Sequence, residues 1–280
     1  MRWRESRRST NIEDRRGMRV GAPVKLGGAG LVLVLVVMLL GGDPGALLNA
    51  IGDPTTMQVP AGGAQPTDEG GEFVARVLGD TEDTWAQLFA QSGSSYDAPV
   101  LVLFTDAVQS ACGFNAAAVG PFYCPADRKV YIDLGFYREL RDRFGAPGDF
   151  AQAYVIAHEV GHHVQNLMGT AERVHAMRGR TSESEANALS VRMELQADCF
   201  AGIWGYYART ERNLLEQGDL DEALNAAAAI GDDRMQRSAG RAVTPESWTH
   251  GSSEQRARWF RRGYENGRVD ACDTFSARTL

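Results

Sequence analysis

The sequence predicts an α+β fold: a mostly helical domain with a small sheet, preceded by one transmembrane helix. Three observations lead to this prediction. Several segments repeat apolar residues at helical spacing, two short apolar runs in the first half are typical of strands, and residues 26–42 form an uninterrupted apolar stretch. The 280 residues are 44% hydrophobic and 23% charged, which suits one globular domain with extensions.

Residues 1–25 form a basic head, expected in the cytoplasm. The head contains eight Arg and Lys residues against three Glu and Asp residues, a formal charge of +5, whereas the whole chain carries −7. The remainder therefore carries −12. An acidic body argues against a nucleic-acid partner, because phosphate binding requires clustered Lys and Arg.

Residues 26–42 predict a membrane anchor. They contain no charged residue, and their 17 positions match the lower end of the roughly 17–25 that cross a bilayer. Basic residues before the run favour a single signal anchor in the lipid bilayer, with the N-terminus in the cytoplasm and the body outside it. A cleaved signal peptide is the alternative, although no A-x-A cleavage site follows closely.

Residues 43–71, rich in Pro, Gly and Thr, are expected to form a flexible linker, and residues 72–280 the folded domain. The predicted elements of that domain are a helix over 73–92, strands over 99–106 and 130–133 with a helix starting after the second, a helix from its N-cap Asp149 to a stop at Gly169, a long helix capped near Ser182, and helices over 219–230 and 253–266.

The pattern His158-Glu-Val-Gly-His162 is a candidate metal centre. Residues four apart share one face of a helix, so both imidazoles can reach one zinc ion. Glu159 projects from the adjacent edge and can hold a water molecule instead of the metal. Two protein ligands are too few for a catalytic zinc site, which normally has three.

A further ligand is expected from the next long helix, where Glu194 and Asp198 are again four residues apart. One carboxylate can bind zinc, while the other can accept a hydrogen bond from Nδ1–H of a ligating histidine. A solvated face is the alternative, but the neighbouring residues are mostly apolar, and buried carboxylates need partners.

The motifs, taken together, resemble those of the bacterial family of neutral zinc metallopeptidases. The similarity covers the basic head and the segments SACGFNAAAVGPFYCPADRKVYIDLGFY, HEVGHHVQNLMG, RMELQADCFAGIW and WTHGSSEQRARWFRRGYENG. The resemblance implies a zincin-like fold in which a glutamate is the third ligand. It implies more about the metal than about the substrate.

On this basis we expect a membrane-anchored peptidase that holds Zn²⁺ through His158, His162 and Glu194, with Asp198 orienting a ligand. Glu159 is the expected general base. The expected substrate is a peptide or protein of the cell envelope. Two alternatives remain open: a non-catalytic, zinc-stabilised scaffold that binds envelope proteins, and a zinc amidase acting on a non-protein amide.

The strand Val130, Tyr131, Ile132 is expected to be an edge strand to which an extended substrate adds by backbone hydrogen bonds. His163 lies about 100° round the helix from His162, so a structural or surface role is expected for it. His175 lies in a polar stretch and is expected to be solvated.

The four cysteines predict disulfides if the body lies outside the cytoplasm. Cys112 and Cys124 flank a short loop containing Gly and Pro and are expected to pair, which leaves Cys199 to pair with Cys272. The alternative is four buried thiols.

His250 is a candidate catalytic residue. It precedes a helix that Ser252 or Ser253 is expected to cap, and its neighbours Thr249 and Gly251 favour a turn. A cysteine bridge to the tail would draw this turn towards the metal helix. His250 could then donate a hydrogen bond to the oxyanion of a tetrahedral intermediate. The alternative is a residue that only fixes the turn.

Overall fold

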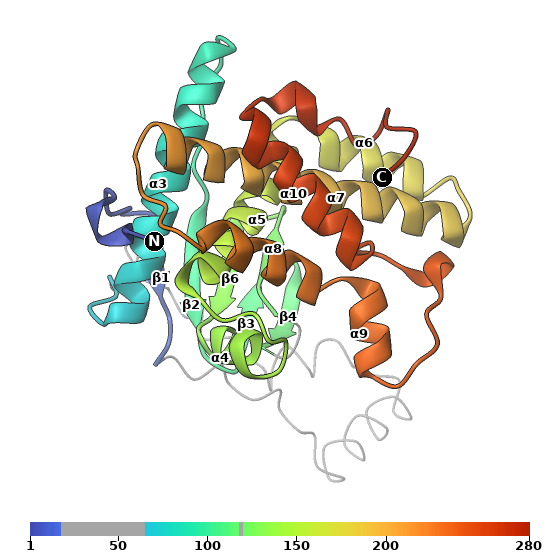
Figure 1. The fold of residues 1–280 in the computed structure, drawn as a ribbon, viewed down its shortest axis with the longest axis horizontal. Helices are drawn as coiled ribbons and strands as arrows, with labels where there is room; N and C mark the ends of the chain where they lie inside the picture. The colour runs from blue at the N-terminus through green and yellow to red at the C-terminus, as the bar shows by residue number, and fades with distance from the viewer. Residues whose placement is uncertain (18–64, 118–119) are drawn as a thin grey trace, which may run out of the picture. The chain divides into compact units, whose positions relative to one another are not determined.

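The computed structural model describes residues 1–17, 65–117 and 120–280. The predicted membrane anchor, residues 26–42, lies outside this part of the chain, as do residues 43–64 of the predicted linker. No helix of the described residues is long and apolar enough to cross a bilayer. The described fold is α+β, as predicted, and helices make up most of it (Figure 1).

Four strands form the larger sheet in the order β1, β2, β6, β5. The first three run parallel, and β5 is antiparallel to β6. A hairpin of two further strands forms a second sheet. The bounds are Ile12–Asp14 for β1, Val100–Phe104 for β2, Ala107–Ser110 for β3, Gly113–Ala116 for β4, Phe122–Cys124 for β5 and Lys129–Asp133 for β6.

β6 is an interior strand, so the prediction that Val130, Tyr131 and Ile132 form an edge strand is wrong. β6 pairs with β2 on one side and with β5 on the other. All three side chains are at most 1% exposed. The strand at this edge of the sheet is β5, whose sequence Phe-Tyr-Cys is too short to produce a period-two pattern.

Residues 1–17 belong to the folded domain, which corrects the prediction that the basic head is separate from it. These residues and the described residues from 65 to 280 form one compact unit. β1 extends the sheet beside β2, and its Ile12 is 2% exposed. Trp3 packs edge-on against Phe73 of helix α3, with ring centroids 5.4 Å apart.

The basic residues of the head pair with carboxylates of the body. Arg8 Nε lies 2.8 Å from Glu72 Oε2, and Arg7 Nη2 lies 2.7 Å from Glu82 Oε2. These glutamates lie on α3, Glu69–Gln91, whose N-cap is Asp68. The helix therefore begins before residue 72, where the sequence placed the start of the domain. These arginines of the head therefore form ion pairs within the folded domain.

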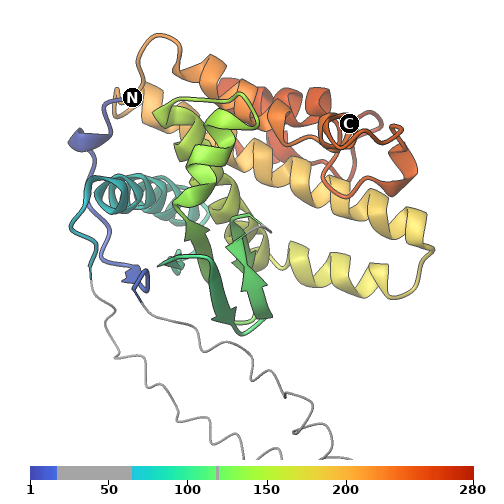
Figure 2. The same ribbon diagram turned by 90° about the horizontal axis from the view of Figure 1, so that it is seen from below.

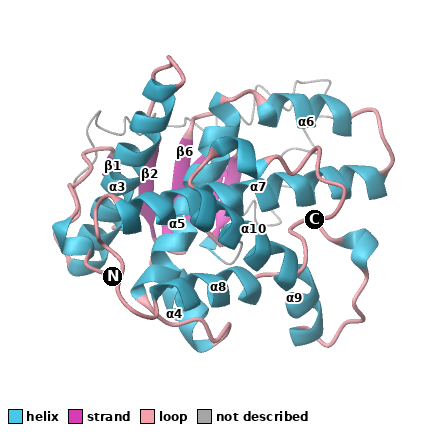
Figure 3. Cartoon of the chain, turned by 45° about the horizontal axis from the view of Figure 1, so that its top comes forward, coloured by secondary structure: helices cyan, strands magenta, loops and turns pink. Residues whose placement is uncertain are grey.

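Helix α5, Asp149–Leu167, packs against the sheet and, besides the helix that follows it in the chain, against three other helices. Figure 3 shows it crossing in front of the strands, and Figure 2 shows the strands below the helical layer. Its neighbours are α3, α7 (Glu183–Thr210) and α8 (Asp219–Ala229), and α10 (Ser253–Asn266) packs along α7. α10 comes very close to α7 at Gly263, where a Cβ would lie 1.9 Å from the carbonyl oxygen of Cys199.

Of the three predicted N-caps, two agree with the structure and one differs. Ser182 and Ser252 cap α7 and α10, each in a capping box. α5 starts one residue earlier than predicted: Gly148 is its N-cap, and Asp149 is already helical. The Glu222 carboxylate of α8 accepts the Phe150 N–H at 3.0 Å instead. The local sequence of α5 cannot predict this contact, because the acceptor belongs to another helix.

The remaining helices are short. α4 (Gly135–Asp142) is the helix expected after the strand at 130–133, whereas α6 (Thr170–Arg178) and α9 (Asp232–Ser238) were not predicted. His175 lies exposed on α6, which agrees with its expected solvation.

Both predicted disulfides are confirmed. Cys112–Cys124 ties the loop between β3 and β4 to β5, and Cys199–Cys272 ties α7 to the C-terminal tail. The described cysteines include no free thiol.

Candidate metal centre

Two helices bring three metal-binding side chains together. His158 and His162 lie on α5, and Glu194 lies on α7. One ligand atom from each residue lies within 4.8 Å of the others. Nε2 of His158 and Nε2 of His162 are each 3.3 Å from an oxygen of Glu194. The spacing of the three residues in the sequence thus produces one cluster of two nitrogens and a carboxylate.

A glycine allows the two helices to approach this closely. Gly161 lies inside the His158–His162 pattern, and a Cβ at this position would lie 2.9 Å from the carbonyl oxygen of Ala197 on α7. Any larger residue would have to push α7 away. The five-residue pattern therefore supplies both imidazoles and the contact that brings Glu194 to them.

Asp198 orients His158. Its Oδ1 lies 2.8 Å from Nδ1 of His158, so Nδ1–H donates and Nε2 keeps its lone pair for a metal. The Tyr154 hydroxyl donates to the same oxygen. Glu194 thus faces the Nε2 atoms and Asp198 faces an Nδ1 atom, which is the division of roles considered from the sequence.

Gln165 orients the second imidazole, and the sequence analysis missed it. Its Oε1 lies 2.9 Å from Nδ1 of His162. Its own amide donates to the Met193 carbonyl at 2.7 Å and to Oε1 of Gln196 at 3.1 Å. The spacing of three residues between His162 and Gln165 on one helix is a signal that could have found this contact.

The donor set fits zinc. Two imidazoles and a carboxylate are ordinary zinc ligands. Burial alone would lower the pKa of His158, but the Asp198 carboxylate raises it to about 10. Burial likewise favours the neutral form of Glu194, but the two histidines hold its pKa well below the usual range. The buried carboxylates thus stabilise positive charge at this point, which a divalent ion would supply.

Glu159 lies beside the ligands and is 8% exposed. Its burial raises the pKa of its carboxyl group above the ordinary value. A raised pKa suits a general base, which works best when its pKa approaches the operating pH. It lies next to His158 on α5, and its role as general base stays a prediction.

A cleft of about 630 Å³ opens over these residues. Its lining includes the three candidate ligands, Glu159 and a group of large apolar residues. That group comes from β5, α4, α5 and the segment around α8 and α9, and consists of Phe122, Phe136, Phe144, Val155, Ile230 and Met235.

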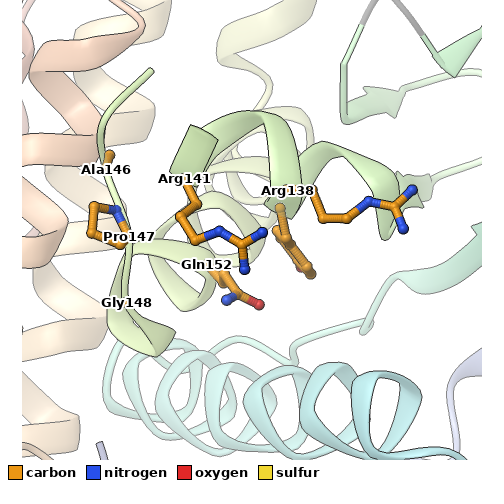
Figure 4. A pocket seen from close by; sticks show the side chains of 7 residues that line it. Arg138, Arg141, Ala146, Pro147, Gly148 and Gln152 are labelled. Atoms are coloured by element: carbon orange, nitrogen blue, oxygen red, sulfur yellow. The ribbon is translucent and has the colours of Figure 1, made fainter. Parts of the chain in front are cut away.

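A smaller hollow of about 200 Å³ lies at the end of α4. Arg138, Arg141 and Gln152 line it (Figure 4), together with Tyr137 and the segment 146–148. None of the candidate ligands is among its lining residues. The three candidate ligands thus line the larger cleft and not this hollow.

His250 lines the large cleft, and Asp232 holds it there. Nδ1 of His250 lies 3.2 Å from Oδ1 of Asp232, and the backbone N–H of His250 donates to Oδ2 of Asp232 at 2.6 Å. The hydrogen bond to Asp232 raises the pKa of His250. No local sequence pattern marks Asp232, because this contact joins the first turn of α9 to a loop 18 residues later.

β5 is fastened to α5 at the cleft. The Tyr123 hydroxyl lies 3.0 Å from Nδ1 of His163 and accepts a hydrogen bond from the Asn166 amide at 3.0 Å. Nε2 of His163 donates to the Asp97 carbonyl at 2.6 Å. His163 is fully buried, and this burial lowers its pKa. It therefore has the structural role that was one of the two expected for it.

Comparison with known proteins connects this geometry with a family. A family model described as "Putative neutral zinc metallopeptidase" matches residues 1–275. The relative named Uncharacterized protein YpfJ, from Escherichia coli K12, is 48% identical over 285 residues, which cover 98% of this chain and 99% of YpfJ. Uncharacterized protein Rv2575, from Mycobacterium tuberculosis H37Rv, is 42% identical over 261 residues, which cover 87% of this chain and 86% of Rv2575. No solved structure matches the chain.

Proposed function

Because the chain belongs to the family of neutral zinc metallopeptidases, we propose that it hydrolyses peptide bonds with a zinc ion held by His158, His162 and Glu194. The convergence of these three side chains under one cleft is the observation that carries the proposal. The proposal includes a zincin-like fold, in which the two histidines of one helix and a glutamate of a later helix bind the zinc ion. When bound, zinc supplies Lewis-acid chemistry: it polarises a carbonyl group and makes a water molecule more acidic.

Glu159 is the general base and then the general acid in this proposal. Its carboxylate takes a proton from the attacking water and delivers it to the departing amine nitrogen. The raised pKa from burial supports this role, because a carboxyl group with an ordinary pKa returns a proton less readily near neutral pH. Asp198 and Gln165 hold the two imidazoles in fixed orientations, so the ligands need no rearrangement.

His250 stabilises the oxyanion in this proposal. It lines the same cleft, and its hydrogen bond to Asp232 favours the charged imidazolium form. Removal of one such donor in other enzymes costs about 2.7–4 kcal/mol of transition-state stabilisation.

The proposed substrate is an extended peptide that adds to β5. β5 is the edge strand, and both Phe122 and Tyr123 line the cleft. Main-chain hydrogen bonds along an edge strand accept many sequences, while pockets select side chains. The apolar residues Phe136, Phe144 and Ile230 of the cleft favour a substrate with a large apolar side chain near the cleaved bond.

A location in the cell envelope is also a proposal, with envelope peptides or proteins as substrates and no nucleic-acid partner. Two disulfides support it, because such bonds persist outside the cytoplasm. The pairing of β1 with β2 adds a condition: residues 1–17 and 65–280 must fold in the same compartment. We therefore propose that the head accompanies the body instead of staying in the cytoplasm. Contact of residues 26–42 with the lipid bilayer remains a prediction.

The test compares wild-type protein with the Glu159→Gln variant on a mixture of denatured envelope proteins. New peptide N-termini, identified by mass spectrometry, are expected with the wild type only. Cleavage by both proteins would assign the activity to a contaminant or to another residue. Cleavage by neither, with zinc bound to both, would favour the zinc-stabilised scaffold, or the amidase if a non-protein amide is hydrolysed instead.

A further inference from the structure

Arg256 of α10 is a buried guanidinium at the metal centre, only 2% exposed. It bonds both oxygens of Asp198: Nε lies 2.8 Å from Oδ2, and Nη2 lies 2.9 Å from Oδ1. This two-pronged contact is the strongest form of the arginine–carboxylate pair. It links α10 to the carboxylate that faces His158.

The guanidinium makes further contacts. Nη2 lies 3.2 Å from the Tyr154 hydroxyl oxygen and 3.3 Å from Nδ1 of His158, and Nη1 lies 3.4 Å from the carbonyl oxygen of Ile230 at the end of α8. Three helices therefore determine where Arg256 points. The close approach of α10 to α7 at Gly263 holds the base of its side chain near Asp198.

We propose that Arg256 is a positioning residue for the metal centre, which acts through Asp198 on His158. This inference rests on the proposed function in so far as the ion is zinc. Two parallel hydrogen bonds prevent the Asp198 carboxylate from rotating, so its Oδ1 stays directed at Nδ1 of His158. The imidazole is thereby kept with its proton on Nδ1 and its Nε2 lone pair towards the ion.

A charge balance explains why the group that bonds Asp198 is positively charged, and the planar fork of the guanidinium explains why it is an arginine. Glu159, Glu194 and Asp198 are three acidic groups at the cluster, and Arg256 contributes one positive charge. With neutral histidines and all three carboxylates ionised, a divalent ion brings the total to zero. Lysine would keep this balance but could not bond both oxygens of Asp198, because it lacks the planar fork. Arg256→Lys therefore removes the two-pronged contact with Asp198 but keeps the positive charge.

The experiment measures the zinc affinity of the full chain by competition with a chromogenic chelator. Arg256→Lys is expected to bind zinc about 10-fold more weakly than wild type, which is the lower end of the usual cost of losing a partner of a metal ligand, because Asp198 itself remains. Arg258→Lys is the matched control, since the same change on the same helix affects an exposed pair with Glu254. Its affinity is expected to equal that of wild type.

A double-mutant cycle with Asp198→Asn tests the route of the effect. If Arg256 acts through Asp198, the double variant loses much less affinity than the product of the two single losses. Independent, multiplicative losses would overturn the proposal, as would wild-type affinity in Arg256→Lys. A raised KM with unchanged zinc affinity would assign Arg256 to substrate binding and overturn it too.

Two further measurements keep the proposal falsifiable. If Arg256→Lys does not fold, Arg256→Gln takes its place, since its amide can bond only one oxygen of Asp198, and wild-type zinc affinity in that variant would overturn the proposal. Failure of the proposed function is distinguishable, because wild-type protein would then bind no stoichiometric zinc, or would bind it without hydrolysing peptides.

Discussion

Asp232 holds His250 at the mouth of the cleft: Oδ1 of the carboxylate lies 3.2 Å from Nδ1 of the imidazole. The same carboxylate accepts the backbone N–H groups of Thr249, His250 and Gly251, so it fixes the loop as well as the ring. The charge of His250, a loop residue, therefore depends on Asp232 of helix α9.

The first prediction is a pH dependence of turnover. The hydrogen bond to Asp232 raises the pKa of His250, so the imidazolium persists above the ordinary value of 6.5 and is lost as the pH rises through the raised pKa. Turnover should fall on this alkaline side. Asp232→Asn removes the negative charge and should move the fall to lower pH, which rate–pH profiles of both proteins would measure.

His250→Ala should reduce turnover on the order of 100-fold while zinc content and folding stay normal. His175→Ala, which changes an exposed histidine on α6, is the control and should leave turnover unchanged. Unchanged turnover in His250→Ala would leave this histidine with a role in the loop only.

The second prediction concerns the head. Ile12 is 2% exposed in a strand paired with β2, so Ile12→Ala should lower the free energy of unfolding by about 2–5 kcal/mol. Arg4→Ala, which alters an exposed ion pair with Glu69, should change it by no more than about 1 kcal/mol. Urea unfolding measures both. An Ile12→Ala protein as stable as wild type would show that the head is not part of the fold.

The third prediction concerns the compartment of the head. All four native cysteines are in disulfides, so an added cysteine is the only free thiol. Arg4→Cys in the head and Arg141→Cys in the body, both exposed, should react equally with a membrane-impermeant maleimide applied to spheroplasts. A head thiol that reacts only after lysis, beside a reactive body thiol, would contradict the shared compartment. Two unreactive thiols would contradict the envelope location.

The fourth prediction concerns how much each disulfide contributes to stability and to zinc affinity. By chain entropy, Cys199–Cys272, which spans 73 residues, stabilises by about 4 kcal/mol, whereas Cys112–Cys124, which spans 12, stabilises by about 3 kcal/mol. Replacing each pair by serines and unfolding in urea tests these values. Zinc affinity should also fall only when the longer bridge is lost.

The reason for this difference is a chain of hydrogen bonds. Gln196 donates to the Cys272 carbonyl at 3.0 Å and accepts from Gln165, which orients His162. Loss of the tail bridge should loosen this chain, whereas Cys112 and Cys124 make no contact with it. Equal zinc affinity in both serine variants would show that the chain does not reach the metal.

The sequence predicted the parts of the site that depend on helix periodicity. His158, His162, Glu194 and Asp198 could be grouped because residues four apart share a face of a helix. Arg256 and Asp232 could not, because they reach the cleft through the packing of α10 and α9, which no local pattern describes. Their partners lie 58 and 18 residues away in the chain.

The two wrong predictions about the sheet and the head have the same physical cause. β1 and β5 are three residues long, so neither produces an alternation of apolar and polar residues. Their place depends on pairing with strands elsewhere in the chain. The charges of the head resembled the cytoplasmic flank of an anchor, but several of them pair with carboxylates on α3.

The most direct test of the account is the zinc content and peptide turnover of three proteins measured side by side. Wild-type protein should hold one zinc ion per chain and cleave peptides, and Glu159→Gln should hold the same zinc without turnover. Glu194→Ala should lose both, because it removes the carboxylate that faces both Nε2 atoms. Full zinc occupancy in Glu194→Ala, or undiminished turnover in Glu159→Gln, would contradict the account.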